Sequence, residues 1–107
     1  MKAQPLRIIS GGYEKCEANE ASHLMFNVPG PIPTRILPVI IKGDRAGTPC
    51  WSWNGDTEKP TIKPSVLSNN GTITCHSFIN DGQVQFLGDC THELANQTLD
   101  LLEVDFG

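Results

Sequence analysis

The chain has 107 residues, of which 38% are hydrophobic and 7% aromatic, so it is long enough for one hydrophobic core but not for two. Twelve acidic and eight basic residues give a formal net charge of −4. The basic residues form no cluster, which argues against direct nucleic-acid binding because phosphate contacts need grouped Lys and Arg. We therefore expect a single domain over residues 1–107.

No apolar segment of the chain resembles a signal peptide or a membrane span. The N-terminal ten residues contain no apolar run of the required length, and the longest apolar stretch, residues 36–41, is interrupted by Pro38. These features predict a cytoplasmic protein of a bacterial host cell with no membrane association. In that reducing compartment the four cysteines would be free thiols or metal ligands rather than disulfides.

Short apolar runs in the first half of the chain predict strands separated by turns. Residues 6–9 predict a first strand, and the polar segment 13–21 predicts a loop or a helical turn. Residues 24–28 and 35–42 predict two more strands. Between them, the Pro-rich segment 29–33 cannot be a central strand, because each proline removes a hydrogen-bond donor from the ladder.

The second half predicts further strands, at residues 51–53, 61–67, 72–79, 83–87 and 99–104. Pro60 and Pro64 predict the ends of the 61–67 segment or a bulge in it. Asn80-Asp81-Gly82 is typical of a tight hairpin turn, and residues 92–97 predict a short helical turn. The chain is therefore expected to be mostly β, as a small sandwich or a barrel-like sheet, with a C-terminal hairpin that carries a metal site.

The predicted hairpin brings Cys75-His76 close to Cys90-Thr91-His92, at the end opposite its turn. Thiolates and imidazoles are ligands that zinc prefers, so we expect a Zn²⁺ site among Cys75, His76, Cys90 and His92. His76 and His92 are the two candidates that we favour most as ligands. Asp89 would orient an imidazole. Adjacent residues on a strand point to opposite faces, so Cys75 and His76 can share one metal only across a bulge. The alternative is that Cys75 packs in the core and His76 makes an ordinary hydrogen bond.

The motif-bearing part of the chain, about residues 50–104, resembles a known family of short phage and bacterial proteins. Members are mostly of unknown function and are often labelled "ammonia monooxygenase", a membrane enzyme that a chain of 11.7 kDa without membrane segments does not fit. The resemblance covers about half of the chain. Its motifs are Trp51-Ser52-Trp53-Asn54-Gly55-Asp56, Glu58-Lys59-Pro60-Thr61-Ile62-Lys63-Pro64-Ser65, Cys75-His76-Ser77-Phe78-Ile79 and Phe86-Leu87-Gly88-Asp89-Cys90-Thr91-His92.

Related domains occur beside bacterial ubiquitin-like conjugation genes, where they resemble metal-dependent proteases built on one Cys, one Glu and two His. The resemblance implies these roles for Cys75, Glu58, His76 and His92. Zinc on Cys75, His76 and His92 would activate a water, and Glu58 would be its general base. Alternatively, Glu58 is a ligand and Cys75 packs in the core. Many relatives have Ser at the position of Cys90.

Three functions fit the sequence. The leading interpretation is a zinc-dependent peptidase, a hydrolase with a protein or peptide partner such as a ubiquitin-like tail. The second is a non-catalytic phage protein that binds and inhibits a host defence complex, as anti-CRISPR proteins do, with zinc only structural. The third is a purely structural domain without metal.

Overall fold

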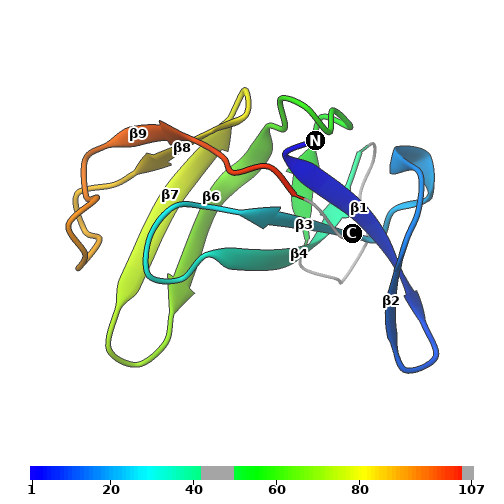
Figure 1. The fold of residues 1–107 in the computed structure, drawn as a ribbon, viewed down its shortest axis with the longest axis horizontal. Coiled ribbons are helices and arrows are strands. Elements are labelled where there is room, and N and C mark those ends of the chain that lie inside the picture. Colours follow the sequence, from blue (N-terminus) through cyan, green and yellow to red (C-terminus); the bar gives the residue numbers. More distant parts are fainter. Residues whose placement is uncertain (42–49, 105–107) are drawn as a thin grey trace.

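The computed structural model describes residues 1–41 and 50–104. These residues form nine β-strands and one short 3-10 helix, η1 (Ala18–Glu20), and contain no α-helix. All nine strands belong to one sheet in the order β2-β1-β3-β4-β5-β6-β7-β8-β9 (Figure 1). The strands are β1 (Ala3–Ile9), β2 (Gly12–Lys15), β3 (His23–Asn27), β4 (Thr34–Ile40), β5 (Trp51–Trp53), β6 (Ile62–Asn69), β7 (Thr74–Asn80), β8 (Gln83–Phe86) and β9 (Thr98–Asp100). The expected mostly-β fold is confirmed.

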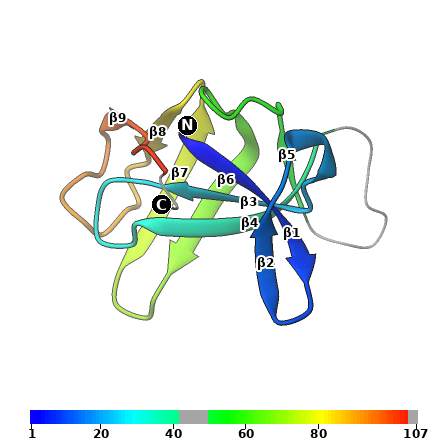
Figure 2. The same ribbon diagram turned by 45° about the vertical axis from the view of Figure 1, so that its right-hand side comes forward.

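The sheet curls so that its two halves face each other, with β3 and β4 crossing the direction of β6 and β7 (Figures 1 and 2). Every neighbouring pair is antiparallel except β4 and β5, which are parallel. A bridge between Asn27 at the end of β3 and Leu102, with a backbone hydrogen bond of 3.1 Å, joins the segment after β9 back to the first half. The sheet therefore approaches the closure of a barrel.

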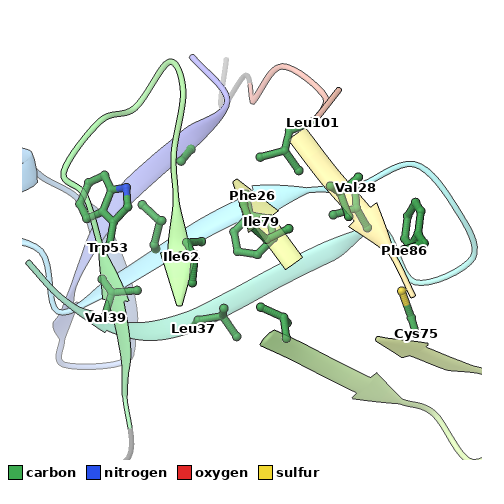
Figure 3. Close-up of a cluster of buried hydrophobic side chains, with 14 of the residues drawn as sticks. Phe26, Val28, Leu37, Val39, Trp53, Ile62, Cys75, Ile79, Phe86 and Leu101 are labelled. Atoms are coloured by element: carbon green, nitrogen blue, oxygen red, sulfur yellow. The ribbon is translucent and has the colours of Figure 1, made fainter. Parts of the chain in front are cut away.

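The hydrophobic core fills the space between the two halves of the sheet (Figure 3). Side chains alternate along the strands, so that every second residue of β3, β7 and β8 is buried. Phe26 of β3 is completely buried, and Trp53 of β5 is 1% exposed. Cys75 lies beside Phe86 at one end of this cluster (Figure 3), so the core reaches the hairpin that was expected to hold the metal.

The predicted hairpin is confirmed in detail. β7 and β8 are joined by Asp81 and Gly82 alone, which both have positive φ values of 52° and 77°. Two consecutive positive φ values match the twist of the flanking strands, and Asp and Gly tolerate them better than most residues.

Three local predictions differ from the structure. β2 overlaps the start of the segment 13–21, which was expected to be a loop or helical turn, and its mostly exposed residues pair with β1 at the edge of the sheet. Without an apolar face, such an edge strand has no period-2 hydrophobic signal. Later in that segment η1 supplies the helical turn. Residues 92–97 form turns rather than a helix, and β9 ends at Asp100. The expected end of a strand at Lys42 lies outside the described residues. Over the described parts of the chain, no helix has the length and apolar character needed to cross a membrane.

Truncation of the central aromatic of β3 should be strongly destabilising. Phe26→Ala removes a fully buried ring and leaves a cavity, so we expect the free energy of unfolding to fall by about 3–5 kcal/mol in a urea titration. Ile8→Ala is the control, because Ile8 is 63% exposed and its truncation should change stability by no more than about 0.5 kcal/mol. Equal losses for the two variants would contradict the assigned core.

Candidate functional site

A bulge in β6 presents Ser65 beside the open face of the hairpin. Ile62 pairs with Ile79 and Val66 pairs with Ser77, so residues 63–65 of β6 stand opposite Phe78 alone. Pro64, at the centre of the bulge, has no N–H to contribute to the ladder. Ser65 is half-buried, and its backbone is also held by Trp51: the carbonyl oxygen of Ser65 accepts a hydrogen bond of 3.0 Å from the indole Nε1–H.

His76 bridges Ser65 and Asp89 through its two ring nitrogens. Nε2 lies 2.9 Å from Ser65 Oγ, and Nδ1 lies 2.9 Å from Asp89 Oδ2. The side chain of His76 is 25% exposed and that of Asp89 is 61% exposed. The three residues thus form a continuous series of hydrogen bonds at the surface of the sheet. Asp89 contacts an imidazole, as expected, but this imidazole is bonded to Ser65 and was expected to be a metal ligand.

The segment that carries Asp89 is held against β7 by hydrogen bonds to Thr74 and to the backbone of His76. Thr91 N–H donates to Thr74 O at 3.0 Å, and Thr74 N–H donates to Thr91 Oγ1 at 2.8 Å. The thiol of Cys90 accepts from His76 N–H and donates to His76 O, each at 3.2 Å. Asp89 is therefore positioned by its own neighbours in the sequence.

The hydrogen-bond partners determine the tautomer of His76. A carboxylate only accepts hydrogen bonds, so Nδ1 carries the proton that is donated to Asp89. In the neutral ring Nε2 is then an acceptor, and it receives the hydroxyl proton of Ser65. A serine hydroxyl that donates to an imidazole held by a carboxylate is the arrangement that activates serine as a nucleophile.

A second group of side chains lies on the core side of the same hairpin. One ligand atom from each of Cys75, Cys90 and His92 falls within 4.8 Å of the other two, so the group could hold a metal ion. Both cysteines are buried, at 2% and 8% exposure. Nε2 of His92 is buried without a hydrogen-bond partner in the described structure, while Nδ1 accepts from Leu94 N–H at 3.2 Å. Burial raises the pKa of the Cys75 thiol, and the neighbouring Arg35 guanidinium opposes that shift.

Of the four expected metal ligands, the structure brings three together and separates the fourth. His76 points to the face of β7 opposite Cys75, as strand alternation requires, and both of its nitrogens contact other residues. Glu58 lies elsewhere: its carboxylate is 69% exposed and 3.8 Å from the N-terminal ammonium. Its loop contacts the β7–β8 turn at Gly82, about 20 Å of strand away from Cys75.

Sequence reasoning did not identify Ser65 as a functional residue. Ser65 stood at the end of one of the quoted motifs, next to Pro64, and the predicted bulge was the available signal. A bulge beside an exposed strand face often re-aims a side chain, but only the observed register shows that Ser65 meets His76.

The sequence was also compared with protein families, curated proteins and solved structures. The model of one family, described as "Bacterial ubiquitination-like system serine protease (BubE)", matches residues 17–87, about two thirds of the chain. The matched part contains Ser65 and His76 and ends just before Asp89. No curated protein and no solved structure matches. The expected relation to bacterial ubiquitin-like conjugation is therefore confirmed at the level of the family.

The four thiols should divide into two classes of reactivity. Cys75 and Cys90 are buried, whereas Cys16 and Cys50 are half-buried. We expect Ellman's reagent to modify Cys16 and Cys50 first in the folded protein and all four thiols after unfolding in urea, as mapped by peptide mass spectrometry. Rapid and equal modification of all four thiols in the folded protein would contradict the buried Cys/His group.

Proposed function

The chain belongs to the BubE family of bacterial ubiquitination-like system serine proteases, and we propose that it is itself a serine protease with Ser65 as its nucleophile. The observation that supports this proposal is the Ser65–His76–Asp89 chain, with two contacts of 2.9 Å. Ser65 lies on β6, His76 on the adjacent β7, and Asp89 on a loop that is hydrogen-bonded to β7. The backbone of the sheet therefore sets the relative positions of the three side chains.

The first step is attack of Ser65 Oγ on the carbonyl carbon of a peptide or ester bond. His76 Nε2 takes the hydroxyl proton as the new C–O bond forms, and Asp89 stabilises the resulting imidazolium through Nδ1–H. His76 then gives this proton to the leaving amine or alcohol when the tetrahedral intermediate collapses to an acyl-enzyme.

The second step returns the enzyme to its starting state. A water molecule attacks the acyl carbon, His76 removes its proton, and the same proton returns to Ser65 Oγ as the acid product leaves. Because His76 is only 25% exposed and Ser65 is half-buried, a substrate seated on this face would exclude most of the remaining solvent.

The partner in this proposal is a protein or peptide substrate, for which the tail of a ubiquitin-like protein is the leading candidate. The family description places related proteins in ubiquitination-like systems. The outer face of β6 and β7 beside the triad is open, since Leu67 and Phe78 are 61% and 44% exposed. An extended peptide tail fits such a face better than a folded domain does.

We also propose zinc as the ion for Cys75, Cys90 and His92, in a structural role. Two thiolates and an imidazole are a zinc ligand set, and the buried Nε2 of His92 would gain the partner that it lacks. Ligation through Nε2 places the ring proton on Nδ1, so Nδ1 could no longer accept the hydrogen bond from Leu94 N–H and would need an acceptor instead. The ion would tie β7 to the segment after Asp89, and proteolysis would not depend on metal chemistry.

Removal of the nucleophile should abolish covalent labelling and hydrolysis. Ser65→Ala is expected to lose reaction with a fluorophosphonate probe and all peptide cleavage. Asp89→Asn should lower kcat by about 10²–10⁴-fold, because an amide at this position favours the wrong tautomer of His76. Ser68→Ala, on the same strand, is the control. If wild-type protein does not react with the probe at Ser65, the protease proposal fails and a non-catalytic binding protein is favoured.

Removal of metal should lower stability. Protein purified without a His-tag or chelator is expected to contain about one zinc per chain by mass spectrometry. Cys75→Ala and His92→Ala should lose the ion, while Cys16→Ala should retain it. Chelation should lower Tm by several degrees, because an ion that binds only the folded state stabilises it. Protein that binds no zinc even when reconstituted with thiols reduced would contradict this part of the proposal.

A further inference from the structure

A hollow of about 260 Å³ lies on the outer face of the sheet, next to the bulge that carries Ser65. Its lining includes Lys63 of β6, Phe78 of β7 and Gln85 of β8. Because residues 63–65 stand opposite Phe78 alone, Lys63 and Ser65 lie on the two sides of Pro64 and share the same cross-strand neighbour. The bulge that presents the nucleophile therefore also forms one wall of this hollow.

The lining combines an apolar floor with a single positive charge. Phe78 is 44% exposed, which leaves much of its ring open to solvent, and Gln85 is its direct partner on β8. Lys63 is the only charged residue of the lining, and no acidic residue contributes to it. Within the described residues no ion pair involves Lys63, although the chain contains twelve acidic residues. The hollow thus offers an ammonium group without an ion-pair partner, on a residue two positions before the reacting serine in β6.

We propose that this hollow binds an acidic side chain of the substrate, on the residue whose carbonyl is attacked by Ser65. The inference rests on the proposed protease function. The Cα of that residue is bonded to the attacked carbon, so its side chain is the one nearest to Ser65 and to Phe78 across from it. The methylene groups of a glutamate would pack on the Phe78 ring, and its carboxylate would accept from Lys63 and Gln85.

The charge of Lys63 sets the preference among side chains of similar size. Glutamine has nearly the shape of glutamate but cannot form an ion pair, and leucine leaves the polar groups of the lining without a substrate partner. A charged hydrogen bond at a partly exposed site favours glutamate over glutamine by about tenfold, the low end of the range for such bonds. A lysine side chain would meet the ammonium of Lys63 and be disfavoured.

Peptidyl phosphonate esters that differ only in the side chain next to phosphorus test the hollow directly. They label the active serine covalently, so the labelling rate of Ser65 can be measured with Glu, Gln, Leu or Lys at that position. We expect the Glu reagent to label about tenfold faster than the Gln reagent. Lys63→Glu should reverse the order so that the Lys reagent is faster than the Glu reagent.

A matched control separates the hollow from the general charge of the protein. Lys15→Glu, on β2, makes the same change in net charge outside the hollow and should leave the Glu/Gln ratio as in the wild type. Equal rates with Glu, Gln and Leu, or a ratio that Lys63→Glu leaves unchanged, would overturn the proposal. A simple fluorophosphonate is run in parallel: if it labels Ser65, such a result counts against the hollow alone, and if it does not, the protease function itself fails.

Discussion

The alternation of side chains along β7 is the constraint on which the site depends. Cys75, Ser77 and Ile79 point into the core, and this burial fixes the opposite direction for His76 and Phe78. A shift of β7 by one residue would put the imidazole into the core and the thiol on the surface. Burial of Cys75, Ser77 and Ile79 therefore directs the imidazole toward Ser65 and Asp89, although none of these three buried residues takes part in the proposed proteolysis.

The same strand connects two groups of different chemistry through adjacent residues. Cys75 precedes His76 and Asp89 precedes Cys90, so each thiol is the sequence neighbour of a member of the hydrogen-bonded chain. The exchange of hydrogen bonds between the Cys90 thiol and the His76 backbone makes this connection rigid. The contacts of Cys90 help to position Asp89, whose side chain is 61% exposed. A solvent-exposed carboxylate gains less stabilisation from a single hydrogen bond than a buried carboxylate does.

The sequence predicted the hairpin well, because Asn80-Asp81-Gly82 contains its own turn chemistry and the flanking residues alternate. It also predicted that Cys75, Cys90 and His92 gather, since a hairpin brings residues before and after it together, but it wrongly included His76 among them. It could not predict that Ser65 meets His76. Pro64 indicated a bulge, but the number of extra residues, which decides which side chain faces the imidazole, depends on pairing between strands. The loop of Glu58 lies at the turn end of the hairpin, opposite the Cys/His group, and the local sequence does not determine at which of the two ends it packs.

The two tryptophans of the chain occupy different environments, and this has an optical consequence. The indole of Trp53 is buried in the core and donates to Asp56 O, whereas the half-buried indole of Trp51 donates to the carbonyl of Ser65. Indole emission depends on the hydrogen bond and the polarity around the ring. The molecule thus contains one indole bonded to the backbone of its nucleophile and another buried in its core, so that a change at the serine acts first on the ring of Trp51.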